Sequence, residues 1–217
     1  MYSNIENITF IQMKNYIFLT FFMIFAIGCS SSKGALKKTF SSEEHTLILD
    51  ADSLKPMRVY KINNTSDSLL LRTKSTYIKP NPKNPVLQHF VKRLYATVRD
   101  SISMGVGIAA PQVGVLKNII WVQRFDKADM PFEVYLNPKI ILYSEQKQTV
   151  KEGCLSIPER TDILNSRSLS VTIAYDTMNG AHASETIQGF TSVIFQHEID
   201  HLNGILYLDH LKKELPE

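Results

Sequence analysis

The chain has 217 residues, of which 44% are hydrophobic and 21% are charged, a composition typical of a globular domain with a sizeable core. The formal net charge of +3 is small, and no basic run is interleaved with aromatic residues, so nucleic-acid binding is not expected. The sequence has no internal repeat and no long low-complexity segment.

The first patterned segment is an uncharged apolar run near the N-terminus, residues 17–27. It is shorter than the span of about 20 residues that crosses a bilayer, and Lys14 supplies a positive flank, so it is typical of a signal peptide. Ala26-Ile27-Gly28-Cys29, followed by serines, is similar to the lipobox of bacterial lipoproteins. In such proteins the cysteine, here Cys29, is lipidated and becomes the mature N-terminus.

Residues 45–78 are expected to form short strands, because apolar runs alternate with breaks rich in Asp, Asn and Ser. The predicted strands are His45–Leu49, Met57–Ile62 and Leu69–Arg72. Three prolines then precede an amphipathic helix that is predicted from about Pro85 to Ser103.

A segment dense in small residues follows this helix, Gly105-Val106-Gly107-Ile108-Ala109-Ala110-Pro111-Gln112. Its Gly-x-Gly start is similar to a dinucleotide-binding loop. We reject that interpretation because a helix precedes the segment, Pro111 interrupts any following helix and the third glycine is misplaced. Small residues instead let another chain approach the backbone closely, and the side-chain amide of Gln112 can donate hydrogen bonds there.

The second half of the chain is expected to be rich in strands. The predicted strands are Asn118–Gln123, Glu133–Leu136, Lys139–Tyr143 and Leu169–Tyr175, and a turn is predicted at Met178-Asn179-Gly180. A free cysteine such as Cys154 is usually a small buried hydrophobe, but its thiolate can also bind a metal. Two cysteines could form a disulfide, but Cys29 is better explained as a lipobox cysteine and Cys154 as a potential metal ligand.

The last predicted helix contains the motif His-Glu-x-x-His at residues 197–201, between Gly189 and Gly204. In a helix His197 and His201 point to the same face, roughly 6 Å apart along the axis, so both can bind one metal ion. Two satisfied core histidines are the alternative interpretation. A catalytic metal usually has three protein ligands, so a third must come from elsewhere. The histidine face is expected to continue toward a core through Phe190, Val193 and Ile194.

Three segments, taken together, resemble the signature motifs of the peptide deformylase family. They are Gly105–Gln112, Glu152–Ser156 and Gln196–His201, which match the family at every defining position and in the family's order. The resemblance covers about residues 68–211. It implies an α+β fold in which antiparallel strands wrap around a central metal-binding helix.

The resemblance also implies a metal and a reaction. Cys154, His197 and His201 would bind one divalent metal ion, with Fe²⁺ favoured and Zn²⁺ or Ni²⁺ as alternatives. The reaction would be hydrolysis of the N-formyl group of N-formylmethionyl peptides, which releases formate. An ion in this site would activate the attacking water.

The family's other site residues transfer to positions of this chain in the same way. Glu198 would carry the proton of the water to the leaving amine, and the oxyanion would be stabilised by the Gln112 amide and the backbone N–H of Leu155. The backbone of Gly107 would pair with the extended substrate. The methionine pocket would be lined by Val106, Phe190, Val193 and Ile194. The arginine expected after Ser156-Ile157-Pro158 is placed differently here, so contacts beyond the methionine are not carried over.

These observations predict a signal peptide over residues 1–29, a tether and N-terminal extension over 30–67, and a catalytic domain over 68–217. We expect a lipid-anchored protein on the periplasmic side of a bacterial cell envelope, or a cytoplasmic protein if the signal is not used. Two other functions stay open. One is a metalloprotease-like amidase, which His-Glu-x-x-His also indicates, and the other is a lipid-anchored, non-catalytic binding protein on the same fold.

Overall fold

The computed structural model describes residues 39–101 and 104–215, so the expected signal peptide, the lipobox and Cys29 lie outside the described residues. The helices are α1 (Ser42–Leu49), α2 (Thr65–Leu71), α3 (Pro85–Arg99), α4 (Gly189–Leu202) and α5 (Tyr207–Glu214). The strands are β1 (Gly107–Ala109), β2 (Ile119–Gln123), β3 (Phe132–Tyr143), β4 (Lys147–Cys154), β5 (Ile157–Ser168), β6 (Ser170–Asp176) and β7 (His182–Gln188), and the short 3-10 helix η1 is Ala110–Val113. No helix in these ranges is long and apolar enough to cross a membrane.

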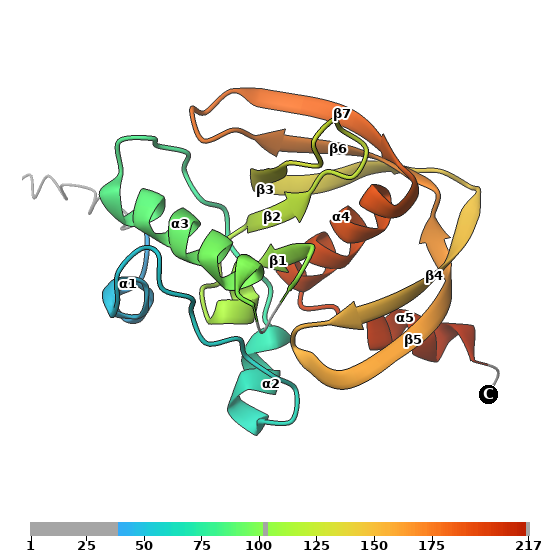
Figure 1. Ribbon diagram of the computed structural model, residues 1–217, viewed down its shortest axis with the longest axis horizontal. Coiled ribbons are helices and arrows are strands. Elements are labelled where there is room, and N and C mark those ends of the chain that lie inside the picture. The colour runs from blue at the N-terminus through green and yellow to red at the C-terminus, as the bar shows by residue number, and fades with distance from the viewer. Residues whose placement is uncertain (1–38, 102–103, 216–217) are drawn as a thin grey trace, which may run out of the picture. The chain divides into compact units, whose positions relative to one another are not determined.

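The strands form two antiparallel sheets, and α4 lies between them (Figure 1). One sheet has five strands in the order β1-β2-β3-β6-β7, and the other is the pair β4-β5. Because strands pack against it on several sides, α4 is buried over most of its surface, including Phe195, Ile199 and Leu202. The prediction of an α+β fold with antiparallel strands around a central helix is confirmed.

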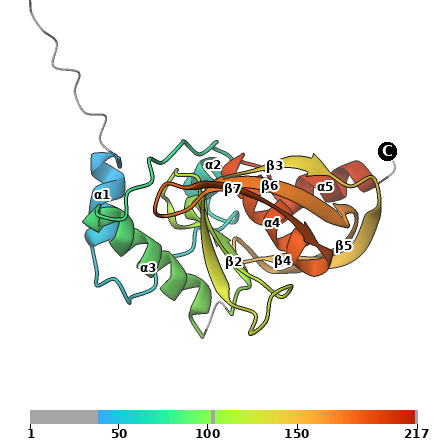
Figure 2. The ribbon, with the colours of Figure 1, turned by 90° about the horizontal axis from the view of Figure 1, so that it is seen from above.

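A second apolar cluster lies around α3, which is beside α1 at the end of the fold opposite α5 (Figure 2). Leu87, Phe90 and Leu94 of α3 pack in one cluster with residues from the preceding segment, namely Phe40, Ile48 and Met57. Residues 39–67 therefore contribute to the core of the same folded unit. The domain boundary at residue 68 stays a prediction.

The prediction of strands within residues 45–78 is wrong. His45–Leu49 belongs to α1, because Ser41 caps that helix and Glu44 completes a capping box. Leu69–Arg72 overlaps α2, which is capped by Asn64. Met57–Ile62 joins no strand, although its backbone makes single hydrogen bonds to neighbouring segments.

The later predictions are closer to the structure. The α3 helix ends at Arg99, earlier than the predicted Ser103, which is outside the described residues. The two strands predicted on either side of Pro138 are one strand, β3, because the pairing with β6 continues after a register shift between Leu136 and Lys139. Asn137 takes a positive φ of 51° at this shift. The turn at Met178–Gly180 is confirmed by the bond from Gly180 N to Thr177 O at 2.9 Å.

Candidate metal centre and active site

Three potential metal ligands converge where β4 ends against α4. Cys154 is the last residue of β4, and its Sγ is 3.2 Å from His201 Nε2. The ligand atoms of Cys154, His197 and His201 all lie within 4.8 Å of one another, and no other such group occurs in residues 39–101 or 104–215. Ligands around one tetrahedral ion are about 3.5 Å apart, given bonds of about 2.0–2.3 Å. One thiolate and two imidazoles thus fit a divalent transition metal in both chemistry and spacing.

A buried carboxylate orients the first histidine. Glu152 lies two residues before Cys154, on the same face of β4, and its Oε2 accepts a hydrogen bond from His197 Nδ1 at 2.9 Å. Arg167 donates to both oxygens of Glu152, at 2.6 and 3.0 Å, and also to Asp200 at 2.7 Å. Burial alone would raise the pKa of Glu152, but the bonds from His197 and Arg167 hold it at about 2. With Nδ1 occupied, His197 presents Nε2 to a metal.

Glu198 is the buried carboxyl group closest to these ligands in sequence. It is 4% exposed, and its Oε2 has no hydrogen-bond partner in the described residues. Burial raises its pKa to about 7, with a further rise from the carboxylates of Glu152 and Asp200 and an opposing effect from His197. A group with a pKa near neutral is suited to accept a proton and return it.

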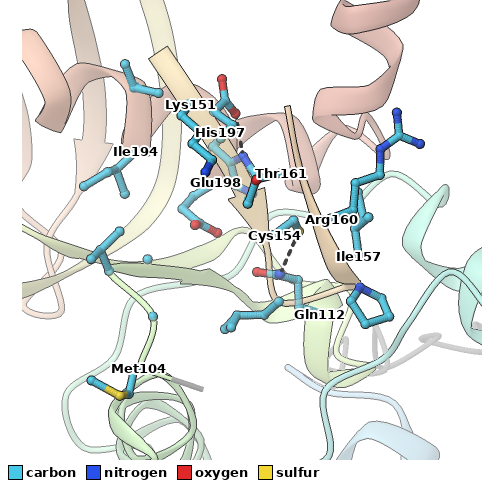
Figure 3. A pocket seen from close by; sticks show the side chains of 18 of the residues that line it. Met104, Gln112, Lys151, Cys154, Ile157, Arg160, Thr161, Ile194, His197 and Glu198 are labelled. Atoms are coloured by element: carbon cyan, nitrogen blue, oxygen red, sulfur yellow. Dashed lines mark hydrogen bonds and ion pairs between the residues drawn. The ribbon is translucent and has the colours of Figure 1, made fainter. Parts of the chain in front are cut away.

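Gln112 is held by hydrogen bonds at both ends of its amide. Its Oε1 accepts from Ala109 N at 2.9 Å, and its Nε2 donates to Ser156 Oγ at 3.2 Å. Nε2 also lies 3.7 Å from Cys154 Sγ, a contact drawn as a dashed line in Figure 3. Leu155 lies in the two-residue turn between β4 and β5, next to Cys154. The amide donor is therefore fixed beside the metal ligands.

A cavity of about 710 Å³ opens in front of this group (Figure 3). Its walls include nearly all of the predicted site residues, namely Val106, Gly107, Gln112, Cys154, Leu155, Phe190, Val193, Ile194, His197 and Glu198. His201 is behind the wall and 1% exposed. The structure thus brings the residues of the three motifs to one site.

The apolar residues of α4 differ in how they meet the cavity. Val193 and Ile194 are buried, in agreement with the expected core-facing position. Phe190 does not point to the core as predicted, because it lies in the first turn of α4, is 47% exposed and packs against Phe125 with ring centroids 5.5 Å apart. It therefore forms part of the cavity rim.

Several residues of the site were missed by the sequence analysis. Glu152 belongs to the second of the three motifs but is given no role by them, although its spacing of two from Cys154 on one strand indicates a shared face. Arg167 and Asp200 complete its network but reach it from β5 and α4. No local pattern indicates these contacts, because they depend on the pairing of β4 with β5 and on the packing of α4 against β5.

The fold and site define a candidate metallohydrolase: an α+β protein with a Cys/His/His ligand set, a buried carboxyl group and a fixed amide donor around one cavity. The model of the polypeptide deformylase family matches residues 59–217. The chain belongs to this family.

Similar proteins extend this result. A peptide deformylase from Desulforudis audaxviator is 36% identical over 153 residues, which cover 70% of this chain and 94% of that protein. Peptide deformylase 2 of Bacillus subtilis is 39% identical over 115 residues, which cover 52% of this chain but only 62% of the relative. A Met-Ala-Ser-bound crystal structure of a class I type b peptide deformylase from Acinetobacter baumannii has a TM-score of 0.62 and 32% identity, covering 71% of this chain and 98% of that one.

Proposed function

We propose that this protein hydrolyses the N-formyl group of N-formylmethionyl peptides and releases formate. The observation that carries the proposal is the convergence of Cys154, His197 and His201 at a cavity whose wall also holds Glu198 and Gln112. Membership of the polypeptide deformylase family supports the same reaction. The Met-Ala-Ser complex of the Acinetobacter baumannii relative supports a peptide with an N-terminal methionine as ligand.

Different residues of the site are proposed to bind the metal, to transfer the proton and to stabilise the oxyanion. A divalent ion held by Cys154, His197 and His201 would supply Lewis acidity to the formyl oxygen and to water. Glu198 accepts the proton of the attacking water and returns it to the leaving nitrogen, which its raised pKa favours. Gln112 Nε2 donates to the oxyanion as charge develops, because its bond from Ala109 N already fixes the amide.

The cavity provides for the rest of the substrate. The backbone N–H of Leu155 is proposed as the second oxyanion donor, and the backbone of Gly107 as the partner of the extended peptide. The methionine side chain is proposed to lie against Val106, Phe190, Val193 and Ile194, which line the cavity.

Fe²⁺ is the metal that we propose for this site. Family resemblance supports Fe²⁺, while a donor set of one thiolate and two imidazoles also suits Zn²⁺ and Ni²⁺. Metal analysis of anaerobically purified protein is expected to give one ion per chain. Cys154→Ala and His201→Ala should each lose it, and retention with unchanged affinity in either variant would contradict the ligand set.

Formate release from a formyl-Met-Ala-Ser peptide tests the activity. We expect metal-dependent formate production, abolished by a chelator and restored by Fe²⁺. Cleavage of internal peptide bonds without formate would indicate the metalloprotease-like amidase. Binding of the peptide without any product would indicate a non-catalytic binding protein.

We further propose that the protein is exported and lipid-anchored through Cys29, so that its substrates are formylated peptides outside the cytoplasm. The support is in the sequence alone: the short apolar run, Lys14 ahead of it and Ala26-Ile27-Gly28-Cys29 after it. Acyl chains on Cys29 would insert into the bilayer, at about 0.8 kcal/mol per CH₂. Mass spectrometry of the native N-terminus should find an acylated Cys29, absent in Cys29→Ala. A soluble, unprocessed chain beginning at Met1 or Met13 would refute the anchor.

A further inference from the structure

The α1 helix is an addition to the region shared with the family. The family match begins at residue 59, whereas α1 spans Ser42–Leu49. The helix has its own N-terminal cap, in which Glu44 N donates to Ser41 Oγ at 3.1 Å and Ser41 N donates to Glu44 Oε2 at 2.8 Å. A short helix of this kind is stable only if tertiary contacts hold it.

Arg93 of α3 supplies such contacts. Its side chain is 4% exposed, and its Nη1 donates to the carbonyls of Leu47 and Ile48, both at 3.0 Å, at the C-terminal end of α1. The same guanidinium is paired with Asp50, and its Nε donates to Lys55 O at 3.1 Å. A buried cation at the C-terminus of a helix satisfies carbonyls that have no partner within that helix. The α1 helix is thus fixed on α3.

From this position Glu44 reaches the loop that follows η1. Its Oε1 accepts a hydrogen bond from Leu116 N at 3.0 Å, and Lys117 Nζ lies 3.6 Å from its Oε2. The Glu44 side chain is only 12% exposed, so these bonds are shielded from water. The Glu44 carboxylate therefore takes part in the N-terminal cap of α1 and also accepts from the backbone amide of Leu116, four residues after Gln112.

The segment between Gln112 and Leu116 has little freedom. Gly114 ends η1 at φ +84°, and a Cβ there would lie 2.6 Å from Tyr60 Oη and 3.0 Å from Leu47 Cδ2. Tyr60 N donates to Gln112 O at 2.7 Å. The turn that carries Gln112 is therefore enclosed by Leu47 of α1 and by Tyr60, and is held beyond Gly114 by Glu44.

We propose that Glu44 is a positioning residue for Gln112: by bonding Leu116 N it anchors α1 against the η1 turn and keeps the Gln112 amide aimed at the developing oxyanion. This inference rests on the proposed deformylase function. Small displacements of a preorganised donor reduce catalysis strongly, because the donor acts mainly on the transition state.

Substitutions at Glu44 test this role through the separation of kcat from KM. Glu44→Ala is expected to lower kcat about tenfold or more, with KM changed less than about twofold and one metal retained. Glu44→Gln should recover most of the activity, because its amide oxygen still accepts from Leu116 N. Glu43→Ala is the matched control, since Glu43 is exposed in the same turn of α1. If Glu44→Ala does not fold, Glu44→Asp replaces it, because its carboxylate is one methylene too short to bond both Ser41 and Leu116.

A double-mutant cycle with Gln112→Ala shows whether Glu44 acts through the glutamine. If it does, Glu44→Ala adds no further loss of kcat in the Gln112→Ala background. Hydrogen exchange gives a readout besides activity: the Leu116 amide should exchange at least tenfold faster in Glu44→Ala, with α4 unchanged. Additive losses, or unchanged kcat and unchanged exchange, would overturn the positioning role. An inactive wild-type enzyme would instead overturn the proposed function, and the positioning role with it.

Discussion

The proposed proton transfer depends on Glu198, whose carboxyl group has a raised pKa. Glu198 is buried and not part of the ligand group, so Glu198→Gln changes its proton chemistry and leaves the metal site intact. We predict one bound metal and a loss of turnover of about 10²–10⁴-fold, the usual contribution of a general acid–base group. Metal analysis and formate release, measured on the same preparation, check this. Near wild-type turnover would exclude Glu198 as the proton carrier.

Besides its proposed pairing with the substrate backbone, Gly107 leaves room for the carboxyl group of Glu198. A Cβ at Gly107 would lie 2.5 Å from Glu198 Oε1 and 2.7 Å from Ile194 Cγ2, which is too close for either to stay in place. We predict that Gly107→Ala lowers kcat at least tenfold while keeping the metal, because Glu198 must move.

The control for this prediction is Gly180→Ala in the turn between β6 and β7. Gly180 has a positive φ of 83°, but the nearest atom to an added Cβ is 3.9 Å away, so only backbone strain is introduced. It should destabilise the protein and leave turnover unchanged. Equal turnover in Gly107→Ala and the wild type would show that the close approach has no effect on Glu198.

Helices and strands were predicted best where a motif or a helical spacing of apolar residues ran without interruption. The α4 helix begins and ends close to the expected Gly189 and Gly204, because these glycines flank an uninterrupted helical segment. The strand predictions before residue 78 were wrong, because apolar residues in helices of seven or eight residues give the same short runs as strands do. The capping box of Ser41 and Glu44 was the available signal for α1.

The metal ligands of the candidate site could be predicted from the sequence, but the hydrogen bonds that surround them could not. Cys154 and the two histidines follow from family motifs, and the structure brings them together. The contacts of Arg167 depend on the register of β5 against β4, which shifts between Gln148 and Val150 and is not encoded in any local pattern. The contacts that α1 makes with Arg93 of α3 and with Leu116 are equally non-local.

The α1 helix gives a stability prediction for Arg93. Arg93→Met removes a buried guanidinium and leaves the carbonyls of Leu47, Ile48 and Lys55 without that donor. Each unsatisfied buried group costs about 1–3 kcal/mol, so we predict a loss of about 3 kcal/mol in the free energy of unfolding. Urea denaturation measures it, with Lys92→Met, an exposed neighbour on α3, as the control. A change below about 0.5 kcal/mol would mean that α1 does not depend on this anchor.

At the scale of the whole molecule, one charged network joins the two-stranded sheet to the central helix. Glu152 of β4 is bonded to Arg167 of β5 and His197 of α4, and Arg167 continues to Asp200. Through His210, which contacts Asp200 at 2.9 Å, the network also reaches α5. Folding and metal binding are therefore linked, because the same network orients a metal ligand and holds β4, β5, α4 and α5 together.

This network predicts how stability depends on acid. The pKa of Glu152 falls from its ordinary 4.5 to about 2 on folding, so the folded state favours the charged form. The stabilisation is therefore fully present above about pH 4.5 and is lost as the pH falls toward 2, and it amounts to about 3 kcal/mol. Glu152→Gln should be less stable at pH 7, because Arg167 is left without its buried partner, and should lose less stability on acidification. Unfolding free energies from pH 7 to 3 measure both effects, with Glu145→Gln, an exposed glutamate between β3 and β4, as the control. An acid dependence as steep in Glu152→Gln as in the wild type would place the titrating groups elsewhere in the molecule.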